Sequence, residues 1–70
     1  MPLVIAPINI MLKVIKILAS EKVKKHLENL GITKGSSLEL LNNDGGNVIL
    51  LVKGSRLALD KDLALKIVVV

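Results

Sequence analysis

The residue best suited to bind a metal ion is His26, the only histidine in a chain that has no cysteine. A metal site needs companion ligands, such as further imidazoles, thiolates or carboxylates at a suitable spacing. If His26 lies on a helix, its neighbours four residues away are Lys22 and Leu30, a cation and a hydrocarbon side chain. We therefore interpret His26 as a surface residue and predict no metal site.

Asp60 and Asp62 are the nearest approach to a pair of carboxylates for general acid and base catalysis. Asp60 is better explained as the cap of the helical turn that follows it, and Asp62 as a solvated charge. Cysteine nucleophiles are excluded by composition. The sequence therefore predicts no catalytic residues, no bound cofactor and no enzyme activity.

Two glycine segments invite comparison with phosphate-binding loops, namely Gly45-Gly46 and Lys53-Gly54-Ser55-Arg56. A phosphate loop needs a strand, the pattern GxxxxGK[ST] and a helix in succession, and this succession is absent from the chain. We interpret the first segment as a hairpin turn and the second as a break between strands.

Lys22, Lys24 and Lys25 form a basic cluster on the segment that also holds His26. Glu21 with Lys25, and Lys24 with Glu28, are pairs of opposite charge four residues apart, as on an ordinary solvated helix face. The cluster is therefore either such a face or part of a docking surface.

The overall charge limits the class of partner. Ten basic and six acidic residues give a formal charge of +4, which favours an acidic partner surface. Phe, Tyr and Trp are absent, so no aromatic side chain can stack on a base, and Arg56 is the only arginine. We therefore expect a protein partner and no nucleic acid.

Length and composition predict a single domain over residues 1–70, with a core of aliphatic side chains because hydrophobic residues make up 51% of the chain. The absence of cysteine fits a reducing compartment, so a cytoplasmic location is expected. The uncharged stretch 1–12 contains two prolines and is shorter than the roughly 20 residues of a membrane span.

Local signals predict one amphipathic helix. Ser20 is a suitable N-cap, and Val23, Leu27 and Leu30 recur at helical spacing after it. Gly31 can adopt a left-handed conformation and end the helix in a Schellman motif, with its neighbour Ile32 against Leu27.

Aliphatic runs between turn formers predict about five short strands, together with a helical turn over 61–65. The first strand, with lysines three residues apart, is expected to be partly covered on both faces. We expect strands over residues 11–18, 38–41, 48–52, 56–59 and 67–70. This pattern predicts a mainly β, partly open antiparallel barrel with one short helix.

The predicted hairpin is apolar on both faces. The larger set should face the core, and it comprises Leu38, Leu40, Val48, Leu50 and Val52. Leu41, Ile49 and Leu51 point the other way, and are either covered by the N-terminal segment and helix or form a contact patch. Together with Lys22, Lys25 and His26 on the helix, they are the candidate partner-binding surface.

Several motifs together resemble the FeoA family, whose members are small proteins of bacterial ferrous iron uptake. The resemblance lies in His26-Leu27-Glu28-Asn29-Leu30-Gly31-Ile32, Lys34-Gly35, Gly45-Gly46-Asn47, Lys53-Gly54-Ser55-Arg56-Leu57-Ala58-Leu59 and Ala64-Leu65-Lys66-Ile67-Val68-Val69. It implies structural roles for Leu30, Gly31, Gly35, Gly54, Ser55, Arg56 and Leu57.

The resemblance implies an SH3-like barrel without enzyme activity. It also implies a partner, the cytosolic GTPase-containing part of the transporter FeoB, and hence only an indirect relation to the membrane. Lys34 stands where the family usually has proline, and the segment Ala6-Pro7-Ile8-Asn9 lacks the family's usual glycine.

Two other functions are considered beside the FeoB regulator. One is a module that binds or senses a transition metal, and the other is an accessory domain like that of metal-dependent repressors. The helix-turn-helix segment with which such repressors bind DNA is not found in this sequence, so direct DNA-binding repression is disfavoured. A weak homo-oligomer, or a weak metal site between two chains, is compatible with the sequence.

Overall fold

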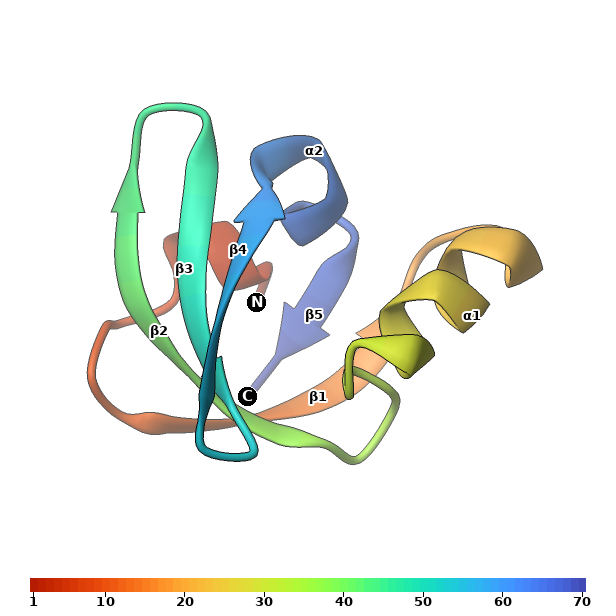
Figure 1. The fold of residues 1–70 in the computed structure, drawn as a ribbon, viewed down its shortest axis with the longest axis horizontal. Coiled ribbons are helices and arrows are strands. Elements are labelled where there is room, and N and C mark those ends of the chain that lie inside the picture. The colour runs from red at the N-terminus through yellow and green to blue at the C-terminus, as the bar shows by residue number, and fades with distance from the viewer.

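The computed structural model describes all 70 residues, Met1 to Val70. Five strands, two α-helices and one 3-10 turn follow each other along the chain (Figure 1). In chain order they are η1 Leu3–Ile5, β1 Met11–Ile17, α1 Glu21–Asn29, β2 Ser37–Asp44, β3 Asn47–Val52, β4 Ser55–Asp60, α2 Lys61–Ala64 and β5 Ile67–Val69.

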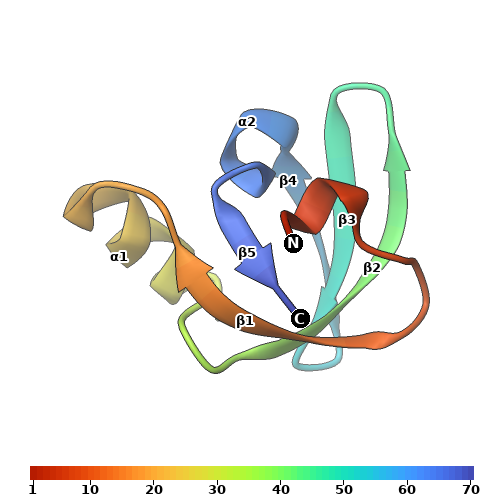
Figure 2. The ribbon, with the colours of Figure 1, turned by 180° about the vertical axis from the view of Figure 1, so that it is seen from behind.

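All five strands belong to one antiparallel sheet in the order β4-β3-β2-β1-β5. The sheet curls around a common interior, with η1 and α2 at one end of it and α1 projecting to the side (Figures 1 and 2). β4 and β5 are the two edges and do not pair with each other, so the barrel is not closed. The predicted mainly β, partly open barrel of five strands is confirmed.

The core is entirely aliphatic. It contains no polar or charged residue, and its members are Leu3, Ala6, Leu12, Val14, Leu27, Ile32, Leu38, Leu40, Val48, Leu50, Val52, Leu59, Ala64, Ile67 and Val69. Each buried leucine, isoleucine or valine contributes about 1.5–3 kcal/mol relative to an exposed one. The inward set predicted for the hairpin is buried in full.

β1 corrects the expectation of two partly covered faces. Leu12 and Val14 are buried, while Met11, Lys13 and Ile15 are exposed. A bulge between Val14 and Lys16 adds one residue opposite β5, and an added residue shifts the alternation of side chains. Lys13 and Lys16 can therefore both be exposed although they are three residues apart.

The hairpin between β2 and β3 is longer than expected. Residues 42–44 are turn formers, yet they pair with residues 47–49 of β3, and only Gly45-Gly46 forms the turn. A bulge between Leu40 and Asn42 lets the strand change register without ending. Pairing with a neighbouring strand overrides the local preference of these residues.

α1 begins and ends as predicted. The Ser20 hydroxyl accepts a hydrogen bond from the backbone N–H of Val23 at 3.3 Å. At the other end, Ile32 N–H donates to the Leu27 carbonyl and Gly31 N–H to the Glu28 carbonyl, both at 2.9 Å. These two bonds define a Schellman motif.

The N-terminal segment forms structure that the sequence did not predict. Leu3 in η1 and Ala6 directly after it are buried in the core. Pro2 forms a bridge with Val68, so the segment lies along the outer edge of β5. Neither α1 nor α2 has the length and apolar character to cross a membrane.

Candidate partner-binding surface

The outer face of the β2-β3-β4 sheet carries the predicted apolar set. Ile49 lies between Asn42 on β2 and Ala58 on β4. Leu41 sits at the bulge beside Asn42, and Leu51 belongs to the same face. All three of the predicted residues are half-buried, so part of each side chain is open to solvent.

Opposite charges flank the apolar set. Leu51 lies between Glu39 on β2 and Arg56 on β4 in one cross-strand row. A hydrocarbon surface beside a carboxylate and a guanidinium can supply both contact area and orientation to a protein partner.

α1 places its three predicted residues on two different surfaces. Lys22 and His26 border a groove between α1 and the start of α2, whereas Lys25 borders a second groove toward β1. The turn between β2 and β3 lies on the far side of the molecule from α1 (Figure 1), whereas the end of β3 approaches the end of α1 at Gly31 and Val52. The three helix residues therefore do not share one groove, and the grouping of all six candidates into one partner-binding surface stays a prediction.

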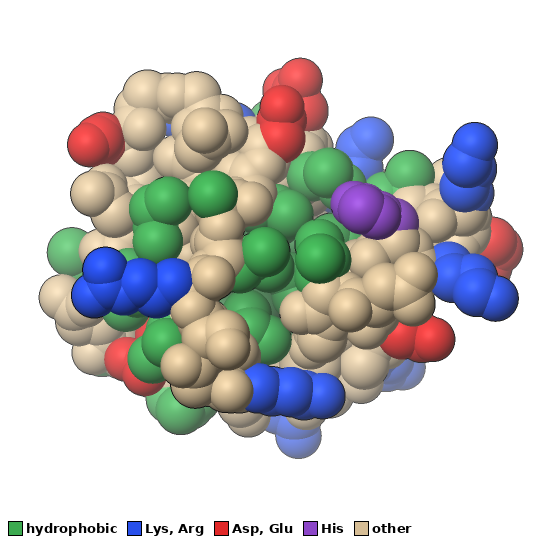
Figure 3. Space-filling view, in the orientation of Figure 1, with side chains coloured by type: hydrophobic (Ala, Val, Ile, Leu, Met, Phe, Trp, Pro, Cys, Tyr) green, Lys and Arg blue, Asp and Glu red, His purple; other side chains and the backbone are tan.

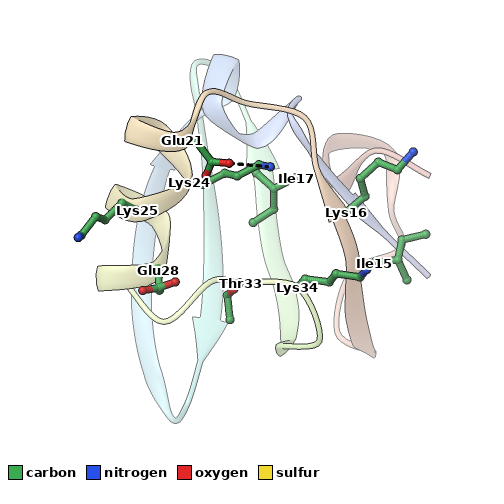
Figure 4. Close-up of a pocket in the computed structure, with 9 residues that line it drawn as sticks. All are labelled: Ile15, Lys16, Ile17, Glu21, Lys24, Lys25, Glu28, Thr33 and Lys34. Atoms are coloured by element: carbon green, nitrogen blue, oxygen red, sulfur yellow. Dashed lines mark ion pairs between the residues drawn. The ribbon is translucent and has the colours of Figure 1, made fainter.

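The groove between α1 and β1 is rich in lysine (Figure 4). It has a volume of about 590 Å³ and is lined by Ile15, Lys16, Ile17, Glu21, Lys24, Lys25, Glu28, Thr33 and Lys34. Four lysines face two glutamates there, so the lining carries net positive charge. Sequence reasoning missed this groove because its lysines come from a strand, a helix and a loop.

The charges on α1 pair differently from the prediction. Glu21 forms an ion pair with Lys24, three residues away, at 4.0 Å, and the predicted pairs with spacing four are not formed. The glutamate side chain is largely exposed, so the pair contributes little to stability.

The groove between α1 and α2 has a volume of about 510 Å³ and is lined by Lys22, Val23, His26, Asp60, Asp62, Leu63 and Lys66. Figure 3 shows hydrophobic side chains on the face between the strands and the single histidine. Two lysines and the histidine face two aspartates here, so the charges of the lining nearly balance and the groove does not favour a ligand of one sign of charge.

A further exposed apolar region was not predicted from the sequence. It follows the N-terminal loop and the outer face of β1, and its members are Ile5, Ile8, Ile10, Met11 and Ile15. Their exposure depends on the path of the N-terminal loop and on the bulge in β1, and neither feature can be recognised from the local sequence pattern.

No three His, Asp or Glu side chains lie close enough together to hold a metal ion. The Asp60 carboxylate accepts a hydrogen bond from Asp62 N–H at 2.7 Å, which is the predicted capping role. His26 shares its groove with two lysines.

The residues of the predicted structural motif lie at the end of α1, in turns and in β4. Leu30 is the half-buried C-cap of α1, while Gly31, Gly35 and Gly54 all have positive φ. Ser55, Arg56 and Leu57 form the first half of β4. A positive φ suits glycine, which has no Cβ, and the structural roles of the other four residues stay a prediction.

A protein named for iron transport is similar to part of this chain. A Methanocaldococcus jannaschii protein, named as an Fe(2+) transport protein A, is 42% identical over 45 residues. The alignment covers 64% of this chain and 55% of that protein, little more than half of its length.

Solved structures share the fold. A crystal structure of an iron uptake regulatory protein, FeoA, has a TM-score of 0.89 and 27% identity, covering 99% of this chain and 93% of that one. ScaR, in a crystal structure with bound Zn²⁺, has a TM-score of 0.87 and 21% identity, covering 97% of this chain and 35% of that one, and shows likeness of fold alone. The expected SH3-like architecture is thereby confirmed.

A family of known proteins matches the whole chain. The FeoA domain family matches residues 1–70, from the first residue to the last. Because this match spans the whole sequence, and because the fold agrees with that of an FeoA crystal structure, the chain belongs to the FeoA family.

Proposed function

We propose that this chain is a cytoplasmic, non-catalytic regulator of ferrous iron uptake. It binds the cytosolic, GTPase-containing part of a FeoB-type transporter and modulates Fe²⁺ transport. The observation that carries this proposal is the match to the FeoA family over residues 1–70. The relative named as an Fe(2+) transport protein A supports the iron pathway.

We assign the contact with this partner to the outer face of β2-β3-β4. Leu41, Ile49 and Leu51 supply half-buried hydrocarbon, and Glu39 and Arg56 flank Leu51. Interfaces of this kind place apolar contact at the centre and charged groups at the rim. The net charge of +4 accelerates encounter with an acidic partner.

Binding between the purified chain and the cytosolic part of the transporter, measured by biolayer interferometry, tests the proposal. We expect Leu51→Ser to weaken binding about tenfold, because a partly exposed leucine at an interface centre contributes about 1.4 kcal/mol or more. Leu65→Ser is the matched control, since Leu65 is a half-exposed leucine just after α2, outside the proposed surface. It should bind like the unmodified chain.

Uptake of Fe²⁺ by cells that lack the chain supplies the functional test. Restoring the unmodified chain or Leu65→Ser should change the uptake rate, and restoring Leu51→Ser should change it less. The proposal is wrong if the chain neither binds the transporter nor alters uptake. If the chain binds the transporter and both leucine variants bind equally well, the proposed regulatory role is retained, but the outer sheet face is not the contact surface.

A further inference from the structure

Residues 1–20 combine aliphatic side chains with positive charge and contain no acidic residue. Four of the aliphatic side chains, in β1 and in the loop that leads into it, are strongly exposed. They are Ile8, Ile10, Met11 and Ile15, each between 43% and 65% exposed. Single exposed aliphatic residues are common on protein surfaces, but four of them within residues 8–15 form a region that points to an interaction.

The outer face of β1 alternates between hydrocarbon and charge. Met11, Lys13 and Ile15 are exposed while Leu12 and Val14 are buried, so the three exposed side chains share one face of the strand. We call these three residues the β1 strip. A lysine in such a strip can lay its hydrocarbon stem along the apolar surface and keep its amine in water.

Two further lysines adjoin the β1 strip at Ile15. Lys16 follows Ile15 in the chain, and Lys34 extends toward Ile15 from the loop before β2 (Figure 4). Neither they nor Lys13 take part in the single ion pair of the structure, which lies within α1. One carboxylate, that of the half-buried Glu39, lies beside the start of the strip. The charge along the strip is therefore positive.

We propose that β1 and the loop before it bind the surface of an anionic phospholipid membrane. The exposed aliphatic side chains enter the boundary between headgroups and acyl chains, and Lys13, Lys16 and Lys34 contact lipid phosphates. Peripheral proteins bind membranes through the same two contributions, namely buried apolar area and attraction to anionic lipids. This direct contact goes beyond the indirect relation to the membrane that the resemblance to the FeoA family implies.

The backbone of β1 suits contact with lipid because it is hydrogen-bonded on both sides, to β2 and to β5. Lys13 exchanges two backbone hydrogen bonds with Val70, at 3.0 and 2.9 Å, and Val14 N–H donates to the Ser36 carbonyl at 2.8 Å. A backbone polar group without a partner is costly near hydrocarbon. Because β1 is an inner strand of the sheet, its outer face presents side chains and offers no free edge for strand pairing with a protein.

The shape of the region favours a lipid surface over a protein partner. Ile8, Ile10 and Met11 line neither of the two grooves of the structure, so they stand on open surface. The side chains that dominate a protein interface fit into well-packed pockets of the partner, whereas a fluid lipid layer adapts to protruding side chains.

Cosedimentation of the purified chain with vesicles tests the proposal. The probes are vesicles of phosphatidylcholine with about 30% phosphatidylglycerol, and vesicles of phosphatidylcholine alone. We expect half of the chain to bind the anionic vesicles at roughly 0.1 mM lipid, and binding to the neutral vesicles to be about tenfold weaker or more. Raising NaCl from about 0.1 M to about 0.5 M should weaken the binding to anionic vesicles. No transporter is present, so the result is independent of the proposed function.

Charge reversal locates the contact on β1. Lys13→Glu should weaken binding to the anionic vesicles about tenfold, because it places a carboxylate within the β1 strip. Lys61→Glu is the matched control, since it changes the net charge equally at the exposed first residue of α2. It should weaken binding by less than about threefold, because salt screens charges that lie away from the membrane.

Truncation of an exposed side chain tests the apolar contribution. Met11→Ser should weaken binding to the anionic vesicles about fivefold, because less hydrocarbon enters the membrane. Leu65→Ser is the matched control, since Leu65 is 50% exposed and lies just after α2. Its binding should stay within about twofold of that of the unmodified chain. Circular dichroism establishes that all four variants are folded.

The proposal is overturned if the chain does not bind anionic vesicles, or if it binds neutral vesicles equally well. It is also overturned if Lys13→Glu and Met11→Ser lose no more binding than their controls. A chain that self-associates without vesicles, and loses this association in Met11→Ser, identifies a second copy as the occupant of the β1 strip and overturns the proposal as well.

Discussion

The side-chain amide of Asn43 on β2 donates a hydrogen bond to the backbone carbonyl of Val4 in η1, 39 residues away in the sequence. The donor is partly buried, and the bond fixes the N-terminal turn to the β2-β3 hairpin. Through η1 this contact also supports the segment that covers the edge of β5.

Asn43→Ala should therefore lower the free energy of unfolding by about 1–2 kcal/mol, because it leaves the partly buried Val4 carbonyl without its partner. Asn42→Ala changes an exposed neighbour of the same type, and should cost less than about 0.5 kcal/mol. Urea denaturation of both variants measures the difference. Equal midpoints for the two variants would contradict a stabilising role for the Asn43 contact.

Gly31 should tolerate substitution poorly. Its φ is +91°, and a Cβ at this position would lie 3.3 Å from Cγ1 of the buried Val52. We expect Gly31→Ala to cost about 1 kcal/mol or more, from backbone strain together with the close contact.

Gly46→Ala is the matched control for this prediction. Gly46 does not have positive φ, and a Cβ there would meet nothing within 4 Å. Its free energy of unfolding, measured by chemical denaturation, should stay within about 0.5 kcal/mol of that of the unmodified chain. A Gly31→Ala variant as stable as Gly46→Ala would show that the end of α1 does not need a left-handed residue.

The two faces of β3 should respond differently to the same substitution. Leu50 is fully buried, whereas its neighbour Leu51 is half-buried on the outer face. Leu50→Ser should cost about 2–5 kcal/mol or unfold the chain, and Leu51→Ser should cost clearly less. Thermal melts followed by circular dichroism distinguish them. If Leu51→Ser destabilises as much as Leu50→Ser, the outer face is internal and is not a docking surface.

His26 should not support tight metal binding. It shares its groove with Lys22 and Lys66, and no group of three potential ligands exists around it. Calorimetric titration with Zn²⁺, or with Fe²⁺ under anaerobic conditions, should show no site with micromolar affinity. A site of 1:1 stoichiometry that disappears in His26→Ala would overturn this expectation and favour the metal-binding alternative.

Local sequence was enough to predict features whose hydrogen bonds close within a few residues. Ser20 caps α1, Gly31 ends it, and Asp60 caps α2, because each bond spans at most five positions in the chain. The inward set of the hairpin followed from the two-residue period of a strand with one face on the core. The resemblance to the FeoA family was likewise present in the sequence motifs.

Tertiary structure alone decided the features that depend on contacts between distant segments. Residues 42–44 became strand because β3 pairs with them, despite their preference for turns. Leu3 is part of the core because η1 folds over the end of the barrel. There the Asn43 side chain holds η1 by a hydrogen bond to the Val4 carbonyl. The lysine groove joins β1, α1 and the loop before β2. Such features depend on which segments meet in space, and local periodicity and capping carry no information about that.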